Sequence, residues 1–454
     1  MSGFFFPERV FSCKIPLISK KISMRRFVST VSKNPFLRNS IILFSGTMVA
    51  NVLNYVFHLM VGRMVSPSAY GEVESLISLL TIISVPAGTL TLIATKYAAD
   101  LKAKRDFQGT SALSKYFTSM VLTYGTPLFL VVFFATPLVR NFLNIESSFP
   151  ILLLWGVMFF SFLSAATSGI LTGWQKFSNT SLVGVLAAGL KLLSVLVLLK
   201  LGFVVSGVVG SFILSTLFVY VANLFLLKRF FQGNTQEEQK IDVSFSDIRS
   251  YVLPAFFGTL SVAILGNVDM IFAKHHLEAS LSGEYGALSV VAKTIFFVTG
   301  VLTTVLFAMS AEENKQGKKG SHTFRLAVGL TALIAIGSVV FFSLFPEFVV
   351  SVLFGAKYLG VSRLLPWFAL AAGVYSLANL FLQYLLSLGE TRVTLLFFAL
   401  AGAEVLALFF FGETLYAIIG ITIGTQVAAA CLGLWFVWKR KLYEQEDLGR
   451  HTGL

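Results

Sequence analysis

The sequence predicts an all-α integral membrane protein with about twelve transmembrane helices, arranged as two parallel six-helix lobes. Its composition, its long apolar runs and an internal repeat each support this prediction. Of the 454 residues, 56% are apolar and 13% are charged, and the mean hydropathy is +0.81. So few charges cannot coat a soluble surface of this size, and the chain is therefore expected to lie in a membrane.

The long apolar runs predict the individual helices. A bilayer core about 30 Å thick is crossed by roughly 20 residues of helix. Runs of this length lie at 40–62, 70–95, 113–137, 149–171, 178–200, 203–227, 249–273, 283–309, 322–345, 361–387, 393–411 and 414–438. Short breaks at Lys200 to Gly202 and at Gly412-Glu413 predict tight helical hairpins. Bends are expected at four prolines that lie within or near the ends of spans, because each lacks a backbone donor. These are Pro86, Pro127, Pro254 and Pro366.

An internal repeat predicts the two lobes. In each half, a Gly-Thr pair opens one span, a Tyr-Gly pair opens the next, and a Gly-x-x-Lys/Arg sequence ends the fourth. The landmarks are Gly46-Thr47, Tyr70-Gly71 and Gly173 to Lys176, then Gly258-Thr259, Tyr285-Gly286 and Gly389 to Arg392. Because each half has an even number of spans, the two lobes should have the same orientation and be related by an axis along the membrane normal.

The distribution of lysine and arginine predicts the orientation. With a cytoplasmic N-terminus, 27 of the 35 basic residues fall in cytoplasmic segments and six on the opposite side. Short loops that carry the positive excess stay in the cytoplasm. We therefore expect a multi-pass protein of the cell membrane with both termini cytoplasmic. The net charge of +13 is then mainly a topology signal rather than a ligand surface.

These patterns divide the chain into five segments. We expect a basic cytoplasmic leader at 1–39, an N-terminal lobe at 40–227, a cytoplasmic linker at 228–248, a C-terminal lobe at 249–438 and a cytoplasmic tail at 439–454. The basic, acid-poor leader is compatible with a transit peptide, and also with a cytoplasmic lead-in whose true start is Met24. The charge pattern of the rest of the chain favours the lead-in.

Neither an enzyme motif nor a metal-binding motif is present in the sequence. The chain has no Walker loop, zincin helix or Gly-x-Ser-x-Gly elbow, and its two cysteines, Cys13 and Cys431, are far apart. No basic run is interleaved with stacking aromatics, so nucleic acid is not an expected partner. We expect no catalytic residues and no metal ligands.

Four charged residues lie inside predicted spans, where a charge is costly and therefore suggests function. They are Lys191, Lys293, Asp269 and Glu404. These charges are tolerable if they face a hydrated cavity or pair across helices. For Lys191 and Glu404, on the fifth helix of each half, a structural ion pair or a snorkelling side chain is the alternative. Lys293, about ten residues into its span, is favoured as a cavity residue.

Uncharged polar residues form a stripe on the first span. Asn51, Asn54 and His58 share one helix face through spacings of three and four. Such a stripe either lines water or bonds a neighbouring helix, and the sequence leaves both open. Glu72 and Glu74 follow at the start of the second span, where acids favour a helix N-terminus. We interpret them as capping and solvated residues.

The passages that carry these residues resemble the polysaccharide-export flippases of the MATE-like multidrug/oligosaccharidyl-lipid/polysaccharide superfamily. Ser45 to Asn51 and Gly62 to Gly71 resemble the opening of such proteins, and Asn267 to Lys293 resembles the corresponding passage of their second half. The resemblance extends over about residues 38–440.

The resemblance implies a V-shaped pair of lobes and a flippase that moves lipid-linked oligosaccharide or polysaccharide precursors across the cytoplasmic membrane by alternating access. The substrate would be a polyprenyl-pyrophosphate-linked glycan. Membrane lipids, a polysaccharide polymerase and glycosyltransferases would be its partners. Two alternatives remain: a cation-coupled exporter of small amphipathic molecules on the same scaffold, and a membrane protein without transport activity, such as an assembly factor or a polymer-forming enzyme.

The same resemblance implies roles for the intramembrane residues. Lys191 and Lys293 become candidates for contacting the pyrophosphate, because ammonium groups attract phosphate strongly in a cavity of low dielectric constant. Asn51, Asn54 and His58 are further candidates for lining the cavity. Asp269 and Glu404 become candidates for coupling to a proton or Na⁺, or for balancing the lysines. No cofactor is expected beyond such a coupling cation or the membrane potential.

Overall fold

The computed structural model describes residues 35–231, 246–315 and 321–452. Within these residues, twelve helical stretches are long and apolar enough to cross a bilayer, which confirms the predicted all-α membrane fold. Most of the leader, including Met24, and most of the linker lie outside the described residues. The predicted segment boundaries therefore stay predictions.

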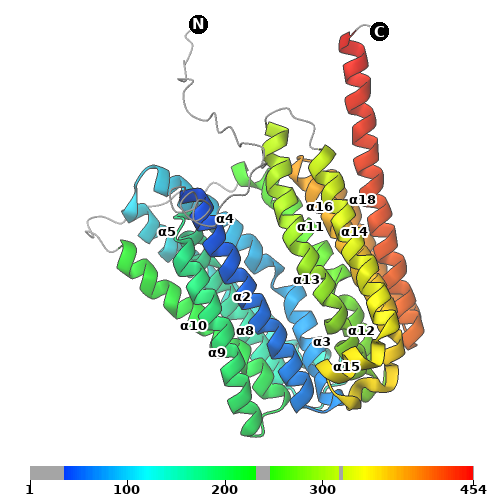
Figure 1. Ribbon diagram of the computed structural model, residues 1–454. Helices are drawn as coiled ribbons and strands as arrows, with labels where there is room; N and C mark the ends of the chain where they lie inside the picture. Colours follow the sequence, from blue (N-terminus) through cyan, green and yellow to red (C-terminus); the bar gives the residue numbers. More distant parts are fainter. Residues whose placement is uncertain (1–34, 232–245, 316–320, 453–454) are drawn as a thin grey trace, which may run out of the picture.

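The helices follow one another with short connections (Figure 1). The first half comprises α2 (Pro35–Met64), α3 (Pro67–Ile83), α4 (Val85–Ala103), α5 (Phe107–Met120), the π-helical turn η1 (Val121–Gly125), α6 (Thr126–Phe134), α7 (Thr136–Phe142), α8 (Phe149–Gly173), α9 (Phe177–Lys200) and α10 (Val205–Phe231). The second half comprises α11 (Ser246–Leu265), α12 (Val268–His276), α13 (Ala279–Lys315), α14 (Ser321–Leu344), α15 (Pro346–Leu353), the 3-10 helix η2 (Ala356–Leu364), α16 (Leu365–Ser387), α17 (Arg392–Phe411) and α18 (Leu415–Thr452).

Four predicted spans are interrupted, the tenth where η2 gives way to α16 just before Pro366. The second divides at Ser84 into α3 and α4, because Pro86 lacks the backbone donor that would continue the helix. The third changes from α5 into η1 just before Pro127, which lies at the start of α6. The seventh divides at Gly266-Asn267 into α11 and α12. Pro254, by contrast, lies inside the continuous helix α11.

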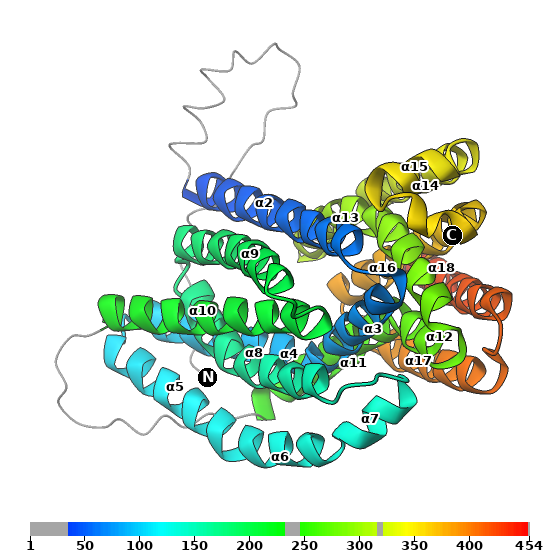
Figure 2. The same cartoon turned by 90° about the horizontal axis from the view of Figure 1, so that it is seen from below.

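The helices form two groups that meet along α3. In the first group α2 packs on α9, α9 on α10, α10 on α8, and α8 on α4. In the second, α13, α14 and α18 pack on α16, and α17 packs on α11 and α18. Although α3 belongs to the first half of the chain, it packs on α12 and α13, and Figure 2 shows it between the two groups. The start of α2 and the end of α18 lie on the same side, which we call the termini side (Figure 1).

Glycines let α3 and α13 approach closely at their ends away from the termini side. A Cβ atom at Gly283 would lie 1.7 Å from the carbonyl oxygen of Pro67. A Cβ atom at Gly71 would lie 2.4 Å from Oγ of Ser282. We call this contact between Pro67–Gly71 and Ser282–Gly286 the seam. The seam contains both repeated Tyr-Gly pairs, with Gly71 of the first half packed against Ser282 and Gly283, one turn before Gly286 of the second half.

Beside the seam, two basic side chains hold helix ends of the opposite group. Lys357, in η2, donates to the carbonyl oxygens of Arg63, at 3.0 Å, and of Val65, at the end of α2. Arg63 donates in return to the carbonyl oxygens of Leu353, at 3.0 Å, and of Val352, at the end of α15. The last carbonyls of a helix lack intrahelical partners and attract cations. Each group therefore caps a helix of the other, and we call these contacts the reciprocal caps.

Buried aromatic residues continue the contact between the halves. Tyr70 and Tyr285, one from each repeat, belong to a single cluster of buried apolar side chains. The ring of Tyr70 packs edge-on against Phe354 and Tyr358, at centroid distances of 5.5 and 5.8 Å. Edge-to-face pairs of this kind add about 0.5–1.5 kcal/mol to the burial of their area. The two groups thus share one core on the side away from the termini.

Candidate functional site

A cavity of about 530 Å³ lies between the two groups of helices. One wall comes from α2, α3 and α4, and the other from α11, α13 and α16. Along α3 and α13, the lining begins at Glu74 and Val290, beyond the seam and toward the termini side. The seam therefore closes one end of the cavity.

The polar stripe of α2 lines this cavity. Asn51, Asn54 and His58 all lie in its wall, together with Tyr55. Neither Asn51 nor Asn54 has a side-chain partner among the described residues. Of the two interpretations that the sequence left open, the structure favours the one in which the stripe faces the cavity rather than a neighbouring helix.

A carboxylate stands behind His58. The Nδ1–H of His58 donates to Oε1 of Glu74 at 2.7 Å. Glu74 also lines the cavity, although only 4% of its surface is exposed. The stem of Glu74 borders the seam, because a Cβ atom at Gly286 would lie 3.2 Å from its Cβ and Cγ. Glu74 therefore contacts both the cavity and the seam.

The interpretation of Glu74 as a capping or solvated residue is wrong. The helix begins at Pro67, and Ser66 caps it by accepting a hydrogen bond from the backbone N–H of Ala69. Glu74 therefore lies two turns inside the helix rather than in its first turn. The Ser-Pro pair is itself a helix-start signal, since serine is a favoured N-cap and proline a favoured first residue. Reading the start there would have identified Glu74 as an intramembrane acid.

Lys293 faces the cavity from the opposite wall. Its Nζ donates to Oδ1 of Asn267 at 3.1 Å. Asn267 lies in the break between α11 and α12, and its own side-chain amide donates to the carbonyl of Ala263 at 2.9 Å. The break thus turns the Asn267 side chain toward Lys293 and holds the lysine in the cavity wall.

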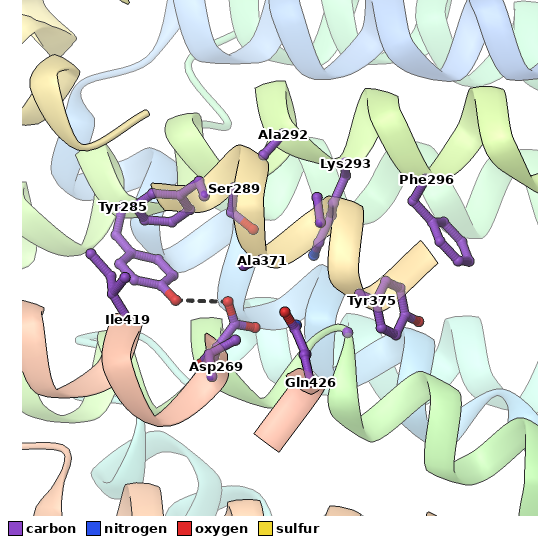
Figure 3. A pocket seen from close by; sticks show the side chains of 14 residues that line it. Asp269, Tyr285, Ser289, Ala292, Lys293, Phe296, Ala371, Tyr375, Ile419 and Gln426 are labelled. Atoms are coloured by element: carbon purple, nitrogen blue, oxygen red, sulfur yellow. Dashed lines mark hydrogen bonds between the residues drawn. The ribbon is translucent and has the colours of Figure 1, made fainter. Parts of the chain in front are cut away.

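A second cavity, of about 40 Å³, lies beside the first and within the second half. Lys293, Phe296 and Tyr375 line both cavities. Figure 3 shows the hydroxyl of Tyr285 pointing at Asp269, and it donates to Oδ2 of that carboxylate at 2.7 Å. Asp269 is therefore not in the main cavity but in the adjoining one, with Lys293 shared between them.

Buried oxygen atoms without hydrogen-bond partners gather near Asp269. Within the described part of the chain, they are Asp269 Oδ1, both carboxyl oxygens of Glu404, Thr422 Oγ1 and Gln426 Oε1. Thr422 and Gln426 line the small cavity with Asp269, whereas Glu404 lies outside both cavities and is fully buried. Unpaired buried polar groups are costly and need an explanation. Oxygen atoms of this kind are ligands for hard cations, and the carboxylates among them can also take up a proton.

Lys191 does not line the main cavity. Its Nζ lies over the rings of Phe57 and Phe212, at 4.5 and 4.3 Å from their centroids, and 8% of the residue is exposed. An ammonium group held between aromatic faces is stabilised by cation–π attraction. The geometry therefore favours the structural alternative for Lys191 over contact with a pyrophosphate.

Comparison with known proteins gives a family match. A family profile described as "Polysaccharide biosynthesis protein" matches residues 36–313. Stage V sporulation protein B of Bacillus subtilis (strain 168) is 24% identical over 371 residues, which cover 72% of this chain and 68% of that protein.

Two solved structures have a similar fold. One is an inward-facing multidrug resistance MATE family transporter of the MOP superfamily, with a TM-score of 0.65 and 17% identity, over 89% of this chain and 98% of that one. The other is the lipid II flippase MurJ in an inward closed conformation, with a TM-score of 0.64 and 16% identity, over 88% of this chain and 87% of that one. At these identities the likeness concerns the fold alone.

Proposed function

Since the chain belongs to the polysaccharide biosynthesis protein family, which the match over residues 36–313 shows, we propose that this multi-pass membrane protein is a flippase for lipid-linked oligosaccharide or polysaccharide precursors. It moves them across the cytoplasmic membrane by alternating access. The two moving parts are the lobes at 40–227 and 249–438. The likeness to the lipid II flippase MurJ supports a scaffold suited to such cargo.

The observation that carries this proposal is the cavity between the two groups of helices. It is closed on one side by the seam, and polar side chains line both of its walls. Transporters commonly bind their substrates between two internal repeats. A cavity that is closed at one end matches one of the two states that alternating access requires.

In this proposal the two walls hold different parts of the head group. Lys293 binds the phosphate of the lipid pyrophosphate, because its ammonium faces the cavity and it is the one lysine or arginine among the described lining residues. Asn51, Asn54 and His58, on the opposite wall, bind the sugar. A head group that contacts both walls binds more tightly when the lobes close around it. Substrate binding is thereby coupled to movement of the lobes.

Asp269 and Glu404 supply the coupling site in this proposal. Their unpaired oxygens, with those of Thr422 and Gln426, are the ligand type that hard cations such as Na⁺ prefer, and either carboxylate can take up a proton. Lys293 lies between this group and the main cavity, so a charge that enters beside Asp269 alters the field at the phosphate. The simpler role for Asp269 is to balance the charge of Lys293. A measurement of transport with and without an ion gradient separates this role from ion coupling.

The termini side is cytoplasmic in this proposal. The excess of lysine and arginine on that side supports the orientation, since cytoplasmic loops carry such an excess. The cavity lies on the termini side of the seam, so the structure corresponds to a state closed toward the outside.

Reconstitution into liposomes tests the proposal. A fluorescent polyprenyl-pyrophosphate oligosaccharide placed in one leaflet should become accessible to a membrane-impermeant reagent on the other side, and protein-free liposomes serve as the control. Deletion of the gene should leave lipid-linked intermediates on the cytoplasmic leaflet. Unchanged glycans together with altered drug tolerance would instead indicate an exporter of small molecules.

A further inference from the structure

The main cavity is close to electrically neutral. Among the described residues that line it, Lys293 and Glu74 have ionisable groups that are charged by default, and they are of opposite sign. His58 is the third described lining residue that can carry a charge near neutral pH, and its Nδ1–H is bound to Glu74 at 2.7 Å. With a neutral imidazole the charges of Lys293 and Glu74 cancel, and with a protonated one a single positive charge remains.

A pyrophosphate takes up the whole of this positive charge. Its own charge exceeds that of one ammonium, so no free cation in the wall remains for a second anionic group. An unpaired carboxylate in a medium of low dielectric constant is costly, and a like charge nearby raises that cost further. Glu74 supplies this like charge on the wall opposite Lys293.

The remaining polar lining suits uncharged hydroxyl groups. Asn51 and Asn54 offer amides that both donate and accept, and neither is engaged by another described residue. The carboxylate of Glu74 accepts hydrogen bonds and cannot donate them when ionised. Tyr55 and Phe297 add aromatic rings from opposite walls, on which the apolar face of a sugar ring can pack. Such a lining offers partners to hydroxyl groups, and it holds no described lysine or arginine besides Lys293 that could pair with a carboxylate.

We propose that the cavity selects lipid-linked glycans whose sugars next to the pyrophosphate are uncharged, and that Glu74 excludes sugars bearing carboxylates such as uronic acids. This inference rests on the proposed flippase function and names its substrate class. Glu74 acts as a specificity residue, since it lies in the wall assigned to the sugar and is hydrogen-bonded there to His58.

A matched set of three ligands tests the inference on the purified full-length protein. The first is a short-chain polyprenyl-pyrophosphate disaccharide built of neutral hexoses. The second carries the corresponding hexuronic acid, and the third carries the methyl ester of that acid. Binding is measured by titration in detergent at neutral pH. The neutral disaccharide and the ester should bind about tenfold more tightly than the acid, because the ester has nearly the size of the acid without its charge.

Two variants locate the source of the discrimination. Glu74→Gln should reduce the preference for the neutral ligand to less than about threefold, since it removes the like charge. Glu72→Gln is the matched control on the same helix, because Glu72 does not line the cavity and pairs with Lys274 at 3.9 Å. It should keep the wild-type preference.

The outcomes separate this inference from the proposed function. If none of the three ligands binds to the wild-type protein, the flippase proposal itself fails. If the acid binds as tightly as the hexose or the ester, the flippase proposal stands and the neutral-sugar inference is overturned. Because the three-ligand comparison uses the wild-type protein alone, it decides the matter even if Glu74→Gln does not fold.

Discussion

The seam and the cavity are formed by the same two helices, yet one is a tight contact and the other an open space. In the seam, α3 and α13 present Gly71 and Gly283, and their backbones approach so closely that a Cβ atom cannot be accommodated at Gly283. A few turns further on, the same helices present Thr81 and Phe297 to the cavity. The helix pair is therefore tightly packed where its residues are glycines, and it lines the cavity where its residues are larger.

The chemistry of the two regions differs as well. The seam and the reciprocal caps are held by backbone contacts and by hydrogen bonds to backbone carbonyls. The cavity instead presents side chains such as Asn54 and Lys293. Backbone contacts do not depend on a ligand, whereas the Asn54 side chain in the cavity has no partner among the described residues. Glu74 belongs to both regions, and this makes it the point at which one can influence the other.

The largest effect is expected in the seam. Gly283→Leu places a side chain where a Cβ atom would already lie 1.7 Å from a backbone carbonyl oxygen. Overpacking of this kind costs about 1–3 kcal/mol or more, so the seam should not close and transport in liposomes should fall by more than about tenfold. Gly300→Leu is the control on the same helix, because a Cβ atom at Gly300 would have no neighbouring atom within 4 Å. This variant should transport normally. Full transport by Gly283→Leu would mean that closure of the seam is not required.

The next effect contrasts two lysines. Lys293→Met should weaken binding of the lipid-linked glycan by about tenfold or more, because a hydrogen bond to a charged group contributes about 1.5–3 kcal/mol. Lys191→Met should leave binding nearly unchanged, because Lys191 lies over Phe57 and Phe212 outside the cavity. Titration of both variants checks this. An equal loss of binding affinity in the two variants would show that Lys191 reaches the ligand.

A smaller effect is expected at the reciprocal caps. Arg63→Gln and Lys357→Gln each remove hydrogen bonds from a charged group to carbonyl oxygens, worth about 1.5–3 kcal/mol. A cysteine placed at Ser282, in a chain without Cys13 and Cys431, should then react about tenfold faster with a membrane-impermeant thiol reagent. The control is Arg363→Gln, whose 88% exposed side chain lies 3.7 Å from Glu347. Exposed ion pairs contribute little to stability. An equal increase in the labelling rate for Arg363→Gln would therefore contradict the role of the caps in holding the seam closed.

The smallest effect concerns the adjoining cavity. Tyr285→Phe removes the hydroxyl that donates to Asp269 at 2.7 Å, which should lower the free energy of unfolding by about 1–3 kcal/mol. The melting temperature in detergent should fall by a few degrees. Tyr416→Phe alters a tyrosine that is 73% exposed and should not change it. An unchanged melting temperature for Tyr285→Phe would show that the hydrogen bond is not stabilising.

The fold could be predicted because its main signal is local. Each span needs about 20 apolar residues, and such runs stand out in a single sequence. The breaks were harder to predict. Pro86 and Pro127 marked two of them, but Pro254 gives the same signal inside a continuous helix. Whether a proline ends a helix depends on what its neighbours can do with the freed carbonyl, which a sequence does not reveal.

The site could be predicted only in part, because its contacts join distant segments. The polar stripe of α2 was visible through its helical spacing, and Lys293 through its depth in a span. Glu74 was missed because the start of its helix was placed too late. The surroundings of Lys191 depend on Phe57 and Phe212, which come from different helices. Aromatic residues are so abundant here, with 46 phenylalanines, that no sequence pattern identifies the two that matter.

The reciprocal caps make the two halves of the chain structurally incomplete by themselves. The carbonyls at the end of α2 are satisfied by Lys357, and those at the end of α15 by Arg63. A fragment containing only one half would therefore lack part of its own helix termination. When the two halves separate, the ends of α2 and α15 lose their caps together, because each cap joins one half to the other.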